Sequence, residues 1–184
     1  MSDDPVVRRW SGGEEVRRIV YSADEIATRV RAMGQEITSA YPNSADLLVI
    51  GLLKGSFIFV GDLVRAIDRP LEVDFLVAAS YGSGSTSSGD VRLLYDPAVE
   101  LRGRHVLLVE DIVDSGTTLN RLVPQLRKRE PRSIELCALL HKHLASSLAL
   151  EPRWVGFDAP NEFLIGYGLD HSESYRNLPF IASL

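Results

Sequence analysis

The sequence contains little of what disulfide-bonded or membrane-spanning proteins need. Its 184 residues include one cysteine, so no disulfide can form within the chain. Cys137 lies inside the apolar run IELCALL, where we expect a small core residue. No hydrophobic run approaches the roughly 20 residues of a membrane span, and the first residues lack the apolar core of a signal peptide. These absences predict a cytoplasmic protein with no membrane partner.

A surplus of positive charge is also missing. The formal net charge is −5, and the short basic clusters RRIV and RKRE have acids close by. Surfaces that bind nucleic acids depend on clustered Lys and Arg, so we expect no nucleic-acid partner. The length allows one domain with a substantial core and is too short for two, which predicts a single domain over residues 1–184.

The most informative stretch is residues 106–119, which read VLLVEDIVDSGTTL. The four apolar residues 106–109 predict a strand that is buried on both faces of a parallel sheet. Acidic, small and hydroxyl residues follow this strand: Glu110, Asp111, Asp114, Ser115, Gly116, Thr117 and Thr118. Apolar residues then recur at helical spacing. The pattern therefore predicts a strand that ends at 109, an acidic loop and a helix.

This loop has the composition of a site for a sugar phosphate and a divalent cation. Small residues at a helix start present backbone N–H groups and the positive end of the helix dipole to a phosphate. Three carboxylates would repel a bare phosphate, so the ligand must also offer hydroxyl donors or a cation such as Mg²⁺. The alternative is an ordinary turn with solvated acids and capping hydroxyls. The density of acids directly after a buried strand favours the ligand site.

Two further buried strands are followed by polar residues. Residues 47–53 (LLVIGLL) precede KGS at 54–56 and a helical pattern, and residues 133–140 (SIELCALL) precede Lys142. Because ligands bind at the carboxyl ends of strands in open parallel sheets, we expect these groups near the loop at 110–118. In the alternative interpretation, the small residues only cap a helix and the lysine is solvated.

Two helices show recognisable boundaries or defects. Ser22 and Glu25 form a capping box before an apolar stripe at helical spacing, and Pro42 ends the pattern. Pro124 lies inside the helix that follows the acidic loop, where it removes a hydrogen bond. We expect a local irregularity near Gln125.

The remaining segments predict a hairpin and a cover. Residues 73–80 and 91–95 predict a strand and its return. The glycine- and serine-rich residues 80–90 between them predict either a flexible hairpin tip or a mobile lid. Residues 153–184 contain short apolar runs that are interrupted by Gly and Pro. We expect small strands and turns that form a hood rather than another strand–helix unit.

These motifs together resemble those of the type I phosphoribosyltransferases. EDIVDSGTTL resembles their phosphoribosyl pyrophosphate signature, LKGS their pyrophosphate loop, and Ser80-Tyr81 the start of their catalytic flap. VGFxxPxxFxxGYGLDxxxxYRNLP resembles the C-terminal part of the 6-oxopurine branch. The match runs from about Ile19 to the last residue. It implies an α/β fold with an open, mostly parallel twisted sheet flanked by helices and a small C-terminal hood.

The resemblance also implies an activity and its residues. The reaction would transfer a 5-phosphoribosyl group from phosphoribosyl pyrophosphate to hypoxanthine or guanine with Mg²⁺ as cofactor, giving IMP or GMP and pyrophosphate. Asp114 would be the general base at N7 of the purine. The phosphoribosyl group would bind Glu110, Asp111, Ser115, Gly116, Thr117 and Thr118. Pyrophosphate would bind Lys54, Gly55, Ser80, Tyr81 and Arg176. The purine would bind Lys142, Phe163, Leu164 and Asp170, and the metal would bind Glu110, Asp111 and Asp170.

Some features depart from this pattern or leave alternatives open. His171 stands where relatives commonly carry Tyr, and Leu164 where Val or Ile is common. A xanthine-preferring phosphoribosyltransferase and a non-catalytic RNA-binding regulator of the same fold are the alternatives. The acidic composition and the intact set of Asp114, Lys142 and Arg176 argue against the regulator. The resemblance further implies a homodimer or homotetramer, and a cis peptide bond between Leu53 and Lys54.

Overall fold

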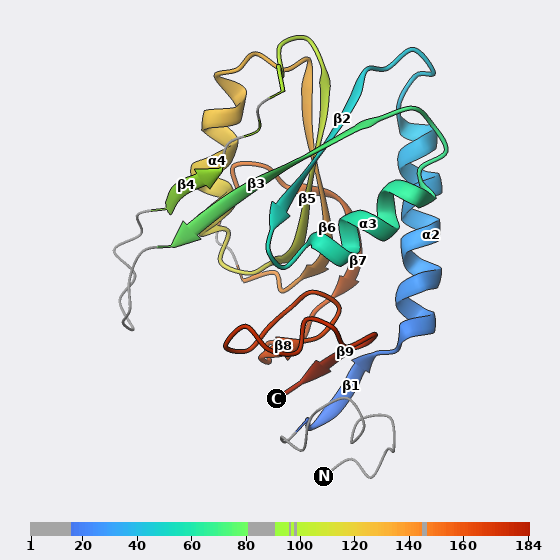
Figure 1. Ribbon diagram of the computed structural model, residues 1–184, viewed down its shortest axis with the longest axis vertical. Coiled ribbons are helices and arrows are strands. Elements are labelled where there is room, and N and C mark those ends of the chain that lie inside the picture. Colours follow the sequence, from blue (N-terminus) through green and yellow to red (C-terminus); the bar gives the residue numbers. More distant parts are fainter. Residues whose placement is uncertain (1–15, 81–90, 96, 98, 145–146) are drawn as a thin grey trace.

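The structure is a computed structural model, and it describes residues 16–80, 91–95, 97, 99–144 and 147–184. Within these residues the chain forms three helices, a six-stranded sheet and a three-stranded sheet (Figure 1). The helices are α2 (Ala23–Ala40), α3 (Phe57–Ala66) and α4 (Thr117–Arg127). The strands are β1 (Arg18–Tyr21), β2 (Leu47–Leu53), β3 (Glu72–Ser80), β4 (Val91–Tyr95), β5 (His105–Val113), β6 (Ser133–His141), β7 (Pro152–Asp158), β8 (Leu164–Ile165) and β9 (Ile181–Ser183).

The large sheet confirms the predicted α/β class. Its strand order is β4-β3-β2-β5-β6-β7, and every neighbouring pair is parallel except β3 and β4. The chain adds β3 on one side of β2 and then returns to add β5 on the other side. This reversal makes a topological switch point at the carboxyl ends of β2 and β5, where open α/β sheets bind ligands.

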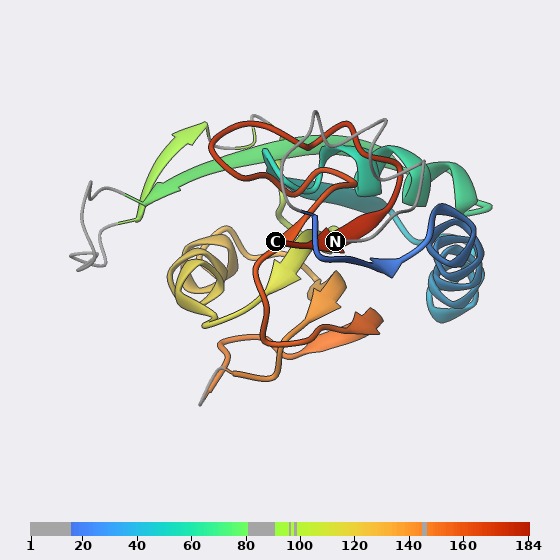
Figure 2. The same ribbon diagram turned by 90° about the horizontal axis from the view of Figure 1, so that it is seen from below.

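Helices cover both faces of the large sheet. Alternate residues of a strand point to opposite faces, so Leu107 and Val109 pack with α2 and α3, whereas Val106 and Leu108 pack with α4. Figure 2 shows α2 and α4 on opposite sides of the strands. This burial on both faces explains why β2, β5 and β6 have continuous apolar sequences.

The small sheet pairs the two ends of the described chain. Its order is β1-β9-β8, with antiparallel pairs, and it lies beyond the carboxyl ends of β2, β6 and β7 (Figure 1). The expectation of small cover strands from residue 153 onward needs one correction. The first strand of that segment, β7, pairs in parallel with β6 at the edge of the large sheet, and the small sheet uses β1 instead.

The end of β5 was predicted wrongly. The strand does not stop at residue 109 but continues to Val113, so Glu110 and Asp111 are strand residues rather than loop residues. Pairing with β6 continues past the acids, because Glu110, Ile112 and Val113 are in register with Ala138, Leu140 and His141. The loop that opens α4 therefore begins at Asp114.

Both helix predictions can be compared with the structure. The capping box of α2 is present, with the Ser22 side chain accepting from the Glu25 N–H and the Glu25 carboxylate accepting from the Ser22 N–H at 2.8 Å. α4 runs without interruption through Pro124 and Gln125, so the irregularity expected near Gln125 does not interrupt the helix. Pro124 lies on the exposed side of α4, where water can bond the carbonyl that loses its donor. No helix in the described part of the chain is long and apolar enough to cross a membrane.

Candidate active site

The turn between β5 and α4 has the geometry of an anion site. Gly116 is the N-cap of α4 and adopts a left-handed conformation, with φ of 75°. It provides no capping side chain, and the first turn of α4 contains no acidic residue. The hydroxyls of Ser115 and Thr117 lie 3.0 Å apart beside it. The first N–H groups of a helix lack partners within the helix, so this turn can bind a phosphate.

Asp114 and Lys142 meet at the mouth of this turn. The Lys142 ammonium donates to Oδ2 of Asp114 at 3.1 Å, and the backbone N–H of Lys142 donates to the Val113 carbonyl at 3.0 Å. The lysine side chain is 11% exposed and the aspartate side chain is 49% exposed. The structure therefore brings together two predicted site residues that directly follow the neighbouring strands β5 and β6, and it leaves the carboxylate accessible.

Two glycines allow three segments to approach closely. A Cβ at Gly55 would lie 1.7 Å from Oδ2 of Asp111, and a Cβ at Gly168 would lie 2.0 Å from the Gly55 carbonyl oxygen. The peptide bond between Leu53 and Lys54 is cis, as the resemblance implied. The loop after β2 is thus packed between the acidic end of β5 and the loop after β8.

The loop after β8 carries a cluster of charges onto the loop after β2. Arg176 donates to the Gly168 carbonyl at 2.8 Å and forms ion pairs with Asp170 at 2.8 Å and Glu173 at 3.1 Å. Glu173 also pairs with Lys54, with Nζ and Oε1 2.9 Å apart. The sequence analysis assigned Asp170 and Arg176 to the site but gave Glu173 no role, so it missed the contact between Glu173 and Lys54. No spacing in the sequence signals this contact, because it joins two residues that are 119 positions apart.

The acids at the end of β5 lie in an environment that disfavours their charge. Burial raises the pKa of Asp111 to about 6, against the favourable effects of the Ile112 N–H and of Arg176. Burial and the neighbouring Asp111 raise the pKa of Glu110 well above its usual range. Oε2 of Glu110 is buried and has no hydrogen-bond partner among the described residues. Both carboxylates therefore favour a ligand that supplies hydroxyl donors or a cation.

The raised pKa of Asp111 predicts a pH dependence of stability. The folded state holds the proton more tightly than the unfolded state, whose pKa is near 3.8. The free energy of unfolding should therefore fall as the pH rises from about 4 to about 6, by at most about 3 kcal/mol from this group. Asp111→Asn should remove this loss, so the variant gains stability relative to wild type over that range. Urea unfolding of both proteins at a series of pH values measures this difference in the free energy of unfolding. If that free energy depends on pH in the same way for the variant and the wild type, the raised pKa of Asp111 is contradicted.

The structure does not bring all of the residues predicted to bind the purine into contact with one another. Phe163 is 54% exposed, and its ring contacts His171 edge-on, with centroids 5.4 Å apart. Leu164 is buried in β8. No hydrogen bond, ion pair or ring contact among the described residues joins Phe163 to Lys142. Ser80 is the last residue of β3, while Tyr81 and the predicted lid beyond it lie outside the described residues.

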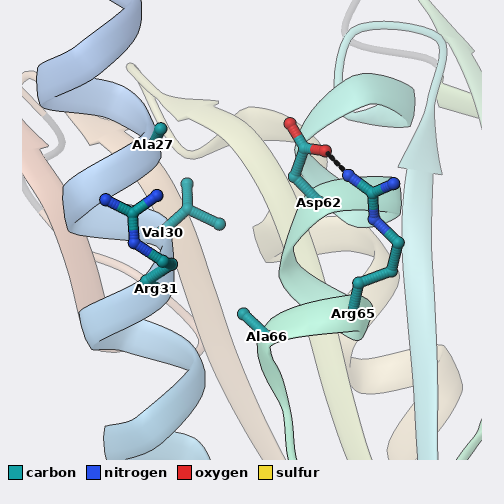
Figure 3. A pocket seen from close by; sticks show the side chains of 6 residues that line it. All are labelled: Ala27, Val30, Arg31, Asp62, Arg65 and Ala66. Carbon is teal, nitrogen blue, oxygen red and sulfur yellow. Dashed lines mark hydrogen bonds and ion pairs between the residues drawn. The ribbon is translucent and has the colours of Figure 1, made fainter.

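A separate cavity lies between α2 and α3. Its volume is about 390 Å³, and its lining combines small apolar side chains with Arg31, Asp62 and Arg65. Figure 3 shows that Asp62 and Arg65 come from α3 and pair across 2.6 Å, while Arg31 comes from α2. The lining of this cavity includes none of the residues predicted for the active site, which lies at the carboxyl ends of the strands.

Fold and site together define an α/β protein with a glycine- and hydroxyl-rich turn at the switch point of its sheet, a geometry that can accept a phosphate. The family model for the phosphoribosyl transferase domain matches residues 19–172. The chain therefore belongs to the phosphoribosyltransferase family.

Named relatives identify the branch of this family. The chain is 45% identical to the hypoxanthine-guanine phosphoribosyltransferase of Mycobacterium avium, with 92% of this chain and 86% of the relative covered. It is 44% identical to the bifunctional protein TilS/HprT of Listeria innocua over 92% of this chain, but it spans 26% of that relative. The crystal structure of a hypoxanthine-guanine phosphoribosyltransferase from Bacillus anthracis superposes with a TM-score of 0.86 at 39% identity, covering 92% of this chain and 99% of that one.

Proposed function

We propose that the chain transfers the 5-phosphoribosyl group of phosphoribosyl pyrophosphate to a 6-oxopurine in purine salvage. Hypoxanthine would give IMP and guanine would give GMP, with release of pyrophosphate. The contact between Lys142 and Asp114 carries this proposal, because it pairs a donor for the 6-oxo group with a carboxylate for proton transfer beside a phosphate-type turn. The names of the relatives support the same reaction.

In this proposal, the turn after β5 binds the 5′-phosphate. The backbone N–H groups and the hydroxyls at Ser115, Gly116, Thr117 and Thr118 donate to the phosphate oxygens. Glu110 and Asp111 accept from the ribose hydroxyls, which fits the unpartnered oxygen of Glu110. The ribose thus lies at the carboxyl end of β5, and the phosphate lies at the start of α4.

The purine binds between Lys142 and the small sheet. The Lys142 ammonium donates to O6, Phe163 stacks on the ring, the backbone of Leu164 meets the Watson–Crick edge, and Asp170 lies at the exocyclic position. The exposure of Phe163 supports this role, because a stacking side chain needs a free face. Adenine carries an amino group at position 6, which cannot accept from an ammonium, so a buried donor would remain unpaired.

Asp114 acts as the general base. As N9 of the purine forms its bond to C1′ of the ribose, the bond from C1′ to the pyrophosphate oxygen breaks and Asp114 takes the proton from N7. Its half-exposed carboxylate can reach a bound ring, and Lys142 orients it. Lys54, Gly55, Ser80, Tyr81 and Arg176 bind the pyrophosphate that leaves.

The end of β5 also fits a magnesium ion that enters with the substrate. Glu110, Asp111 and Asp170 offer hard carboxylate oxygens, which Mg²⁺ prefers, and one oxygen of Glu110 has no partner within the described part of the chain. No group of three acidic, His or Cys side chains in the described part of the chain is arranged to hold a metal by itself. Substrate oxygens would therefore complete the coordination. Bound Mg²⁺ would neutralise the pyrophosphate as it leaves.

Replacing Lys142 tests the purine assignment. Lys142→Gln should lower kcat/KM for hypoxanthine about 10- to 100-fold, because a charged donor to O6 is replaced by a neutral one. KM for phosphoribosyl pyrophosphate should change little, since the lysine does not face that substrate. Steady-state kinetics with each substrate varied in turn measures both quantities. An equal rise in both KM values would contradict the assignment.

An ultraviolet assay with Mg²⁺, phosphoribosyl pyrophosphate and each base in turn tests the function itself. We expect turnover with hypoxanthine or guanine. Preference for xanthine would favour the first alternative. Absence of turnover together with salt-sensitive RNA binding would favour the regulator. A homodimeric or homotetrameric state and a cytoplasmic location stay predictions.

A further inference from the structure

Glu173 holds both of the cations that the proposed function assigns to pyrophosphate. Oε1 accepts from the Lys54 ammonium at 2.9 Å, and Oε2 accepts from the Arg176 guanidinium at 3.1 Å. Lys54 is 119 residues from Glu173 in sequence and lies in the loop after β2. Arg176 is three residues from Glu173 and lies in the same loop after β8. One carboxylate therefore bridges the loop after β2 and the loop after β8.

The position of Glu173 is fixed by its own backbone. Its N–H donates to Oδ2 of Asp170 at 2.9 Å, and its φ of 66° places it in the left-handed region. The Lys54 ammonium and the Arg176 guanidinium donate to the two oxygens of its carboxylate. An anionic group thus stands where two cations converge.

We propose that Glu173 takes the place of the substrate's pyrophosphate on Lys54 and Arg176 in the free enzyme and must leave these cations when the substrate binds. This inference rests on the proposed function. The two anions cannot share the cations, because a carboxylate beside pyrophosphate adds like-charge repulsion. Glu173 is a positioning residue, which holds the two cations ready and returns to them as pyrophosphate leaves.

The strength of the ion pair fits such an exchange. The Lys54 side chain is 63% exposed and that of Glu173 is 65% exposed. Ion pairs with this exposure are weak, since solvent screens them. A polyphosphate with several negative charges can displace the carboxylate. The competition with Glu173 therefore lowers the affinity of the enzyme for pyrophosphate groups by a modest factor.

Glu173→Gln tests the exchange, because it removes the charge and keeps the shape. KM for phosphoribosyl pyrophosphate should fall about threefold, and the inhibition constant of pyrophosphate should fall by a similar factor. kcat should also fall if pyrophosphate leaves more slowly, while KM for hypoxanthine stays unchanged. Calorimetric titration with Mg²⁺-pyrophosphate gives an independent measure of the tighter binding.

Glu130→Gln is a matched control. Glu130 also has a left-handed backbone, with φ of 55°, and its carboxylate pairs with Arg102 at 3.1 Å. The Glu130 side chain is 64% exposed and that of Arg102 is 74% exposed. It lies in the turn after α4, away from the two loops, so its kinetic constants should equal those of wild type.

The result separates the possibilities. If Glu173→Gln raises KM for phosphoribosyl pyrophosphate or leaves both constants unchanged, the exchange is wrong, because the glutamate then supports binding or plays no part in it. If the wild-type protein shows no transfer at all, the proposed function fails first. If transfer occurs and pyrophosphate inhibits it, only the role of Glu173 is in question.

Discussion

Asp114→Asn should slow phosphoribosyl transfer to hypoxanthine about 10²- to 10⁴-fold, because an amide cannot take a proton from N7. The amide oxygen can still accept from Lys142, which keeps the local geometry. The side chain is half-exposed, so the free energy of unfolding should change little. Single-turnover rates with saturating substrates, measured beside urea unfolding, separate the loss of chemistry from a loss of fold.

Asp68→Asn is the control for this variant. Asp68 is an exposed acid just after α3, on the opposite end of that helix from the loop after β2, and its removal should leave the rate unchanged. An Asp114→Asn enzyme that turns over at close to the wild-type rate would remove Asp114 from the mechanism.

Gly168→Ala should destabilise the protein by about 3 kcal/mol or more and raise KM for phosphoribosyl pyrophosphate. Gly168 has a φ of 103°, and a Cβ there would lie 2.0 Å from the Gly55 carbonyl oxygen, which is backbone and cannot rotate away. The loop after β2 or the loop after β8 must then move. Urea unfolding and steady-state kinetics measure the two effects.

Gly103→Ala distinguishes the clash from backbone strain. Gly103 also has a left-handed φ, 73°, but a Cβ there would meet nothing within 4 Å. Its substitution should destabilise the protein by only about 1 kcal/mol, through strain alone, and leave the kinetics unchanged. Equal effects of the two variants would show that the close contact between Gly168 and Gly55 contributes nothing.

The parts of the fold that depend on local pattern were predictable. Residues 47–53 form β2 as predicted, because an unbroken apolar run suits a strand covered by helices on both faces. The capping box at Ser22 marked the start of α2 for an equally local reason. The turn after β5 was recognisable because a glycine with hydroxyl neighbours, directly after a buried strand, is typical of a turn that opens a helix.

The parts that depend on distant contacts were not predictable from pattern. Glu110 and Asp111 look like loop residues, and only pairing with β6 extends the strand past them. The four residues of β1 carry too little periodicity to show that they pair with β9 at the other end of the chain. The contact between Glu173 and Lys54 depends on how two loops meet in space, which no spacing in the sequence records.

The central claim is that the turn at residues 114–118 binds the phosphate of a purine nucleotide while Lys142 binds the keto group of its base. A crystal structure with IMP bound tests it most directly. We predict the 5′-phosphate against the backbone N–H groups of residues 115–118 and the Lys142 ammonium within hydrogen-bond distance of O6. A phosphate bound elsewhere, or a base turned away from Lys142, would contradict the account.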